Sequence, residues 1–416
     1  MDESRAVTDR FSRFGPGIMI AATAVGVSHL VQSTRAGADF GLTLAGAIIL
    51  ITFLKYPAFR FAAEYASITG KSIVAAYAEQ GRIALGWLVF TMMIEMLVGT
   101  SAVALVTSGI LQNVLGLSIA GPIVPIAVAM VTALVLMNGS YTRVEKLMKV
   151  MVVVFTIVTV IATIVAFPRL AALGRGVFAP LNLDMSTVAI LIALTGLMPL
   201  PLSGTAYHSV WVRAKVRATN GTYTRARAVF DLNVGWVVTL VLALCFVVLG
   251  TAVLFRSGTD APASAPEFAG LLFSMFTEVT GPWVYPVIAL GGVAVIWSTL
   301  VAILDAVPRL TERIYHELVD SSDNERGMYR LFLVVQTVLG SLVLAFFLGD
   351  FRRFIDFAAS TGFIVAPALA WFNYRALLSE AVAREYRPSR AIVIWHWTAM
   401  VSFLISAILF FVIRFT

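Results

Sequence analysis

The chain has 416 residues, of which 59% are hydrophobic and only 13% are charged. A soluble protein carries about 25% charged residues, so these few polar groups cannot cover a chain of this size in water. The composition excludes a soluble enzyme, a disordered protein and a disulfide-rich secreted domain, and the single cysteine, Cys245, allows no intrachain disulfide. The net charge of +7 is typical of cytoplasmic loops that face anionic lipid, and we expect no nucleic-acid partner.

Apolar segments long enough to cross a bilayer recur along the whole chain. A membrane span takes roughly 20 predominantly apolar residues. We predict one all-α integral membrane domain over residues 1–416, acting as a monomer, with no cofactor and no enzymatic activity. Its eleven spans are 15–34, 42–62, 86–113, 121–138, 147–167, 187–211, 229–255, 283–306, 329–349, 354–374 and 392–413.

The positive charges predict the orientation in the membrane. With the N-terminus in the cytoplasm, 22 of the 30 Lys and Arg residues fall in cytoplasmic segments, beginning with Arg5, Arg10 and Arg13. Cytoplasmic loops carry an excess of Lys and Arg. We therefore expect a cytoplasmic N-terminus and an external C-terminus in the plasma membrane, which in a bacterium is the inner membrane.

Two of the predicted spans contain helix-breaking residues. Gly26 lies near the middle of the first span, and Pro199 and Pro201 interrupt the sixth. A broken helix is tolerated in a bilayer only where the freed backbone lines a protein cavity. Because the breaks lie five spans apart, two five-span halves would have opposite orientations. This pattern predicts inverted repeats at 15–167 and 187–374, an extra helix at 392–413, and a substrate site at the two breaks.

Several short motifs resemble the Nramp family of divalent-metal transporters. They are GPG at 15–17, AGADFG at 36–41, ITG at 68–70, RVEK at 143–146, Met198-Pro199, and HSV at 208–210. The resemblance implies a LeuT-like fold, in which helices 1 and 6 are broken, and secondary-active transport by alternating access.

The metal motifs of that family are altered in this chain. The family's Asp-Pro-Gly-Asn falls on residues 26–29, so that Gly26 replaces the carboxylate and His29 the asparagine, and Leu200 replaces the histidine of Met-Pro-His. A dication facing Gly26, His29 and Met198 would have no counter-charge from these two spans. We therefore predict that the metal site is lost, and that Gly26→Asp with His29→Asn would rebuild it.

The same breaks suggest another cargo. Half-helix N-termini direct partial positive charge into such a cavity. With no carboxylate in spans 1 and 6, the cavity suits an anion, a small organic acid or an amino acid. The candidate substrate-binding residues are Gly26, Ser28, His29, Gly196, Met198, Ser203 and Thr205.

Other interpretations remain open from the sequence. The protein could be a proton-coupled divalent metal transporter that uses a divergent site of His29 and Met198, since imidazole and thioether suit softer ions. It could also be a transport-dead sensor on the same scaffold. His29 could equally be a structural histidine bonded to a carbonyl that the break frees.

Ionisable residues at membrane depth are costly and usually paired. The candidates for ion pairing or coupling are Lys55, Glu95, His208 and Asp231. We expect Lys55 to pair with Glu95, whereas Asp231 could simply stabilise a helix N-terminus. Asp305 lies near the end of the eighth span, where we expect a solvated position.

Overall fold

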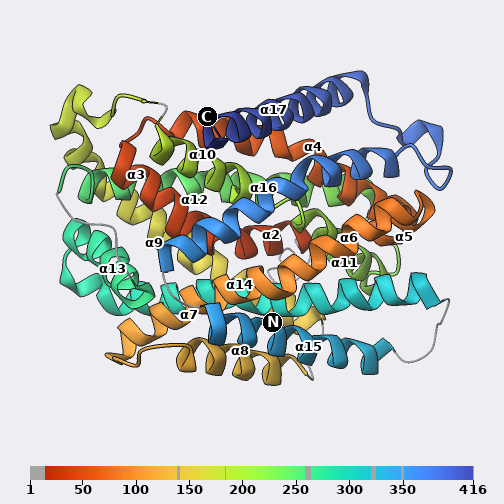
Figure 1. Ribbon diagram of the computed structural model, residues 1–416, viewed down its shortest axis with the longest axis horizontal. Coiled ribbons are helices and arrows are strands. Elements are labelled where there is room, and N and C mark those ends of the chain that lie inside the picture. The colour runs from red at the N-terminus through yellow and green to blue at the C-terminus, as the bar shows by residue number, and fades with distance from the viewer. Residues whose placement is uncertain are drawn as a thin grey trace, which may run out of the picture.

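The computed structural model describes residues 15–137, 141–182, 184–257, 264–319, 325–347 and 351–415. The N-terminal segment with Arg5, Arg10 and Arg13 lies outside the described residues. The regular secondary structure of the described residues is helical, apart from one isolated β-bridge between Gly41 and Phe178. Most helices run along the longest axis of the molecule (Figure 1).

The first half of the chain forms α2 (Pro16–Ala24), a π-helical segment (Val27–Ser33), α3 (Thr34–Phe40), α4 (Ala45–Thr69), α5 (Ile73–Glu79), α6 (Arg82–Ile94), a second π-helical segment (Glu95–Gly99), α7 (Thr100–Leu115), α8 (Ile123–Leu136) and α9 (Tyr141–Leu173). The second half forms α10 (Met185–Leu197), α11 (Gly204–Ala218), α12 (Arg225–Val253), α13 (Ala265–Thr280), α14 (Tyr285–Val319), α15 (Glu325–Phe347), α16 (Phe351–Ala376) and α17 (Arg390–Phe415). Short 3₁₀ turns lie at Gly174–Val177, Pro282–Val284 and Arg384–Tyr386.

The helices correspond to the predicted spans. Among the described residues, eight helical segments are long and apolar enough to cross a membrane. Three shorter apolar helices, Ile123–Leu136, Thr187–Leu197 and Arg390–Ser406, coincide with the fourth, sixth and eleventh predicted spans. In the sixth span, α10 supplies only the first half, and α11 continues it after the break.

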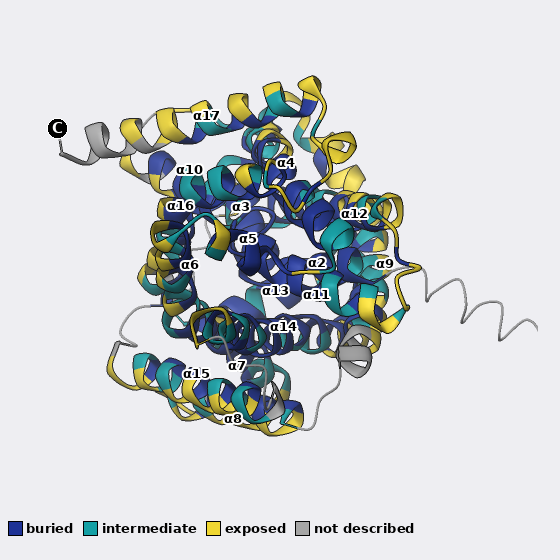
Figure 2. Ribbon diagram, turned by 90° about the vertical axis from the view of Figure 1, so that its right-hand side faces the viewer, coloured by how far each residue is buried: buried dark blue, intermediate teal, exposed yellow. Residues whose placement is uncertain are grey.

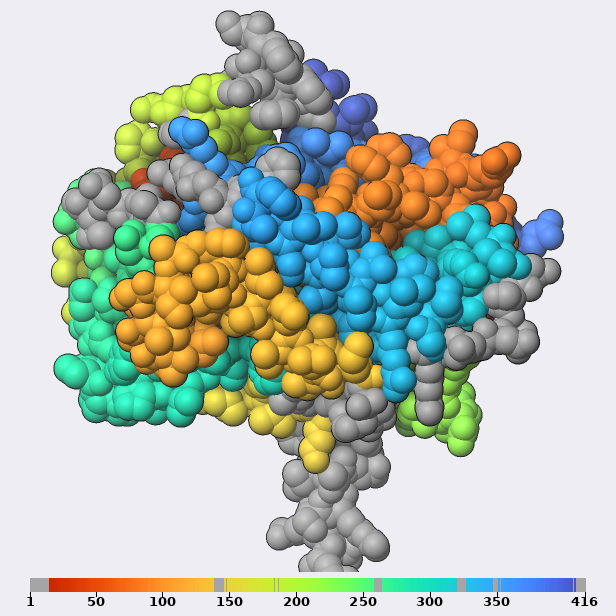
Figure 3. Space-filling view, turned by 60° about the horizontal axis from the view of Figure 1, so that its bottom comes forward, coloured from red at the N-terminus to blue at the C-terminus, as the bar shows by residue number. Residues whose placement is uncertain are grey.

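The first span lies at the centre of the bundle. Its most apolar window is 94% buried, against 33% for the windows of the fifth and ninth spans. Seen end-on, the central helices are buried, while α8, α15 and α17 expose one face at the periphery (Figure 2). The space-filling view shows α8 and α15 side by side on one outer face, with α13 at one end (Figure 3).

Glycines bring the central helices into backbone contact. A Cβ on Gly17 of α2 would overlap the carbonyl of Asp231 on α12, and one on Gly235 would overlap the carbonyl of Gly17. Gly196 of α10 likewise lies directly against the carbonyl of Ala359 on α16. Small residues allow such close approach between membrane helices, where dispersion and hydrogen bonding replace the hydrophobic effect. These contacts fix both broken spans against their neighbours.

Candidate functional site

The break in the first span lies at Val25 and Gly26, as the sequence predicts. α2 ends at Ala24. The amide nitrogen of Gly26 lies 2.7 Å from the carbonyl oxygen of Ala24 and donates to it, which closes a tight turn. A glycine is needed here because α14 comes close: a Cβ on Gly26 would lie 2.6 Å from Cγ2 of Thr299. The Thr299 hydroxyl in turn donates to the carbonyl of Ala22, at 3.1 Å. Glycine at position 26 therefore allows the break to pack closely against α14.

The break in the sixth span runs from Met198 to Ser203. α10 ends at Leu197 and α11 begins at Gly204, with both prolines in the segment between. Pro199 and Pro201 lack the amide hydrogens that a continuous helix would need. This confirms the predicted break and its cause.

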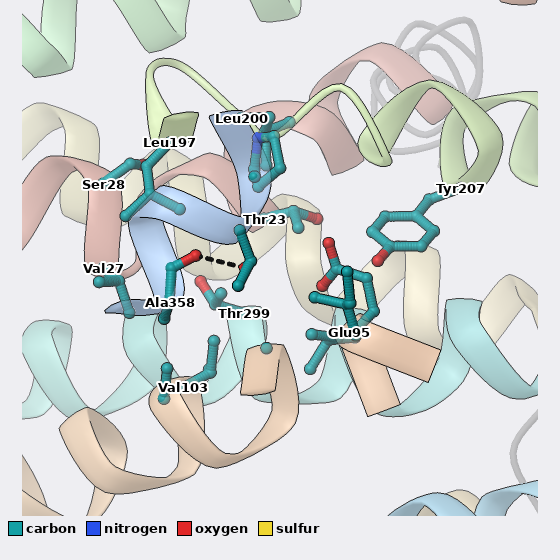
Figure 4. Close-up of a pocket in the computed structure, with 17 residues that line it drawn as sticks. Thr23, Val27, Ser28, Glu95, Val103, Leu197, Leu200, Tyr207, Thr299 and Ala358 are labelled. Atoms are coloured by element: carbon teal, nitrogen blue, oxygen red, sulfur yellow. Dashed lines mark hydrogen bonds between the residues drawn. The ribbon is translucent and has the colours of Figure 1, made fainter. Parts of the chain in front are cut away.

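A cavity of about 80 Å³ lies between the two breaks (Figure 4). Residues of spans 1, 3, 6, 8 and 10 line it. Most of its wall is apolar, including Val27, Leu197 and Leu200. The polar lining residues are Thr23, Ser28, Glu95, Tyr207, Thr299 and Thr361.

Glu95 places a carboxylate in this cavity. The π-helical turn Glu95–Gly99 begins at this residue, and a Cβ on Gly99 would overlap the carboxylate, so glycine leaves the room that it occupies. The Ser203 hydroxyl donates to Oε1 of Glu95, at 2.5 Å. Tyr207 of α11 directs its hydroxyl towards Glu95 (Figure 4). Single π-helical turns are often found at functional sites.

This carboxyl group corrects the expectation of a cavity without a carboxylate in its wall. The sequence argument considered spans 1 and 6, whereas Glu95 lies in span 3. The expected positive charge of the half-helix is also reduced. The amides of Gly204, Thr205 and Ala206 at the start of α11 already donate to carbonyls within their own turn. Both observations oppose an anionic cargo in this conformation.

Ser28 lies where the sequence predicts, at the cavity wall, and it joins the two breaks. Its Oγ is 2.5 Å from the carbonyl of Ala24 and 3.1 Å from the carbonyl of Pro199. His29, the next residue, faces away from the cavity and is fully buried. Its Nε2 lies 2.8 Å from the carbonyl of Thr239 on α12, and its Nδ1 lies 2.8 Å from Oγ of Ser28. A carbonyl can only accept, so Nε2 carries a hydrogen, and both ring nitrogens of His29 are bonded within the protein.

The other five predicted substrate residues do not line the cavity, and they are Gly26, Gly196, Met198, Ser203 and Thr205. Gly196 packs on α16. Met198 is buried, and its sulfur accepts a hydrogen bond from Ser33, at 3.7 Å. The Thr205 hydroxyl accepts from Asn373, at 2.9 Å. Their contacts stabilise the break without lining the space beside it.

The expected pair of Lys55 and Glu95 is wrong. Among the described residues no ion pair joins them, and Lys55 donates to the carbonyls of Gly196 and Leu200 instead. The freed backbone of the break, which the charge argument did not consider, provides these acceptors.

The remaining ionisable candidates lie apart from the cavity. Asp231 on α12 accepts the amides of Gly15 and Gly17 and the Tyr223 hydroxyl, so it caps α2 rather than its own helix. His208 on α11 is fully buried, and within the described part of the chain neither of its ring nitrogens has a hydrogen-bond partner.

Asp305 is fully buried, which contradicts the expected solvated position. It forms a bidentate ion pair with Arg309, one turn later on α14, at 2.7 Å, and accepts the Tyr329 hydroxyl at 3.1 Å. Buried charges are paired in this way because burial alone is costly.

The sequence reasoning missed Thr23, Thr299 and Thr361 as lining residues. Each is an isolated hydroxyl within an apolar span, and such residues usually bond to the carbonyl one turn back, as Thr23 does to Met19. No local pattern separates a lining threonine from the others.

These features define a membrane transporter of the broken-helix type. Three solved structures have similar folds. A mutant manganese transporter of Eremococcus coleocola matches with a TM-score of 0.68 at 15% identity, over 95% of this chain and 85% of that one. MhsT in complex with L-phenylalanine matches with a TM-score of 0.65 at 16% identity, over 96% and 98%. A Na⁺-coupled sialic acid symporter matches with a TM-score of 0.66 at 13% identity, over 94% and 87%. The LeuT-like fold is thereby confirmed.

The family follows from the sequence comparisons. The family described as natural resistance-associated macrophage protein-like, Nramp, matches residues 17–413. An uncharacterized protein of Pasteurella multocida is 28% identical over 376 residues, which cover 89% of this chain and 86% of the relative. The chain belongs to the Nramp family and is a secondary transporter of that family.

Proposed function

We propose that this Nramp-family transporter carries a small organic solute with an amine or another hydrogen-bond donor, in place of a divalent metal ion. The main support for this function is the chemistry of the cavity between the two breaks. Among its described lining residues, Glu95 is the one charged side chain, and the other polar groups are hydroxyls. A carboxylate surrounded by hydroxyls and apolar walls suits a donor group on a small solute.

The donor set does not favour a transition-metal ion. Divalent cations in proteins prefer several oxygen, nitrogen or sulfur ligands, with anionic charge among them. The described residues contain no group of three or more His, Cys, Asp or Glu side chains that could hold one. Gly26 has no side chain, and His29 bonds to α12 instead of the cavity.

The cavity also narrows the range of organic solutes. Glu95 would repel an organic acid unless the carboxyl group were protonated, so we favour an amine or an amino acid, whose ammonium group can meet Glu95. In this conformation the space of about 80 Å³ has room for only a few non-hydrogen atoms. A larger cargo would require the cavity to widen during alternating access.

Ligand binding to purified protein tests this function. We would measure thermal stabilisation and calorimetric binding with Mn²⁺, small primary amines, amino acids and organic acids, and then uptake of the best ligand into proteoliposomes. We expect an amine-bearing ligand to bind. Replacing Glu95 by Gln keeps the shape and removes the charge, and should weaken binding by at least about tenfold, since hydrogen bonds to charged groups contribute about 1.5–3 kcal/mol.

The matched control is Glu79→Gln. Glu79 is a surface carboxylate that lies 3.9 Å from Lys71, and its substitution should leave binding unchanged. Saturable transport of Mn²⁺ at micromolar concentration would refute the proposal, as would amine binding that is unchanged in Glu95→Gln.

A further inference from the structure

Lys55 connects the end of α10 to the linker at the break in the sixth span. It lies in the middle of α4 and is fully buried. Its Nζ donates to the carbonyl oxygens of Gly196 and Leu200, each at 3.0 Å. Gly196 is in the last turn of α10, and Leu200 is in the linker after it. One side chain from span 2 therefore ties the last turn of α10 to the linker that follows it.

Both carbonyls have lost the partners that a helix would give them. In a continuous helix the amide of Leu200 would donate to Gly196, and the amide of Gly204 would donate to Leu200. The helix ends at Leu197, and the Gly204 amide donates to Pro201 instead, at 2.9 Å. No water in the bilayer core can replace those donors. The amine of Lys55 supplies them.

The position also suits the N–H donors of a lysine. The last carbonyls of a helix have no amide partners within the helix, and donors placed there satisfy them. Ser203, at the end of the same linker, donates to Glu95. The linker is thus held at Leu200 by the Lys55 amine and at Ser203 by the Glu95 carboxylate, and Leu200 itself forms part of the cavity wall.

We propose that Lys55 is a built-in ligand of the break and positions the cavity wall. The carbonyls of Gly196 and Leu200 form a site for the N–H donors of a primary amine, and the Lys55 side chain occupies it permanently. The break then persists without a bound ion. This role is independent of which solute the protein carries.

Removing the side chain should expose the site to a free amine. Lys55→Ala deletes three methylene groups and the amine, which together correspond to n-propylammonium. We expect this variant to lose at least a few degrees of thermal stability. n-Propylammonium should restore most of that loss in a saturable way, and should bind the variant at least about tenfold more tightly than it binds wild type.

Matched ligands and variants separate this site from general stabilisation. n-Propanol lacks the ammonium group and tetramethylammonium lacks N–H donors, so neither should restore stability. Lys55→Met fills the space without a donor, and should be destabilised and not rescued. Lys215→Ala removes another buried lysine, on α11, and n-propylammonium should not rescue it.

Two results would overturn the proposal. One is a Lys55→Met protein as stable as wild type, because the donors would then be unnecessary. The other is a Lys55→Ala protein that n-propylammonium does not stabilise, including one that fails to fold when expressed and purified with the amine present. A variant that can be purified only with the amine supports the proposal.

Discussion

Gly26 shows how one residue determines whether the family's metal chemistry can be restored. The sequence suggests that Gly26→Asp with His29→Asn would rebuild two ligands. In the structure a Cβ at position 26 would lie 2.6 Å from Cγ2 of Thr299, and position 29 faces α12. We therefore expect the double variant to gain little metal binding, and Gly26→Asp with Thr299→Ala to gain more, because the shortened side chain leaves room for the carboxylate.

The size of this effect follows from electrostatics. At an effective dielectric of about 20, a carboxylate about 4 Å from a dication contributes on the order of 8 kcal/mol of gross attraction. Even a quarter of this is more than tenfold in affinity. Calorimetry with Mn²⁺ on wild type, Thr299→Ala alone and the two double variants measures it. Equal affinity in Gly26→Asp/Thr299→Ala and Thr299→Ala would show that position 26 does not face the cargo.

Individual site residues were predictable only in part. Ser28 lies at the cavity as expected, but His29 is one residue further along a helical segment. Successive residues of any helix point in different directions around its axis, so neighbours in sequence face different elements. Spacing to a break therefore identifies the segment, and the packing of α12 and α14 decides which side chain enters the cavity.

An ion pair joins the second half of the first span to the tenth span. Arg35 of α3 donates to Asp356 of α16 at 2.7 Å, and it also contacts Gln32 at 3.3 Å. The same two spans line the cavity through Ser28 and Thr361. The side chains of Arg35 and Asp356 are 14% and 32% exposed, so the pair itself contributes at most about 1 kcal/mol.

We expect Asp356→Asn to make the cavity more accessible from the side of Arg35 with little change in stability. The measurement is the rate at which a thiol reagent modifies Thr361→Cys in a Cys245→Ser background, which should rise severalfold. Exchanging the charges, with Arg35→Asp and Asp356→Arg together, should return the rate towards its original value. A rate that Asp356→Asn leaves unchanged would show that this pair does not close the cavity.

At the level of elements, the sequence predicted the breaks but not the contacts that stabilise them. Gly26, Pro199 and Pro201 act through their own backbone chemistry, which can be recognised locally. Lys55 acts through carbonyls that are available only because span 6 is broken. Opposite charges suggested a pair with Glu95, whereas the unsatisfied backbone was the stronger partner.

The architecture of the whole molecule was the most predictable feature. It was predicted from eleven apolar segments and from the odd number of spans between the two breaks. Both features depend on the composition of the segments and change little when individual residues are replaced. The packing order does not follow from composition. It depends on glycines such as Gly17 and Gly235, whose contact is visible only when α2 and α12 are placed together. The cap that Asp231 provides for α2 has the same origin.

The orientation in the membrane is a prediction from the distribution of positive charge over the whole molecule. Each Lys or Arg near an anionic cytoplasmic surface contributes about 1 kcal/mol, so the large excess on one side should fix one topology. We expect Lys71, between α4 and α5, and Ala383, between α16 and α17, to face the cytoplasm. Ser118, between α7 and α8, should face outside. All three residues are exposed in the structure.

Single cysteines at these positions, in a Cys245→Ser background, provide the measurement. In intact bacterial cells a membrane-impermeant maleimide should label Ser118→Cys at once, and should label Lys71→Cys and Ala383→Cys only after the cells are permeabilised. The two cytoplasmic positions lie eight spans apart on the predicted topology, so their agreement also checks that the spans between them are even in number. The opposite pattern would invert the molecule, and different labelling of Lys71→Cys and Ala383→Cys would mean that one of the shorter helices, such as α8, does not cross the membrane.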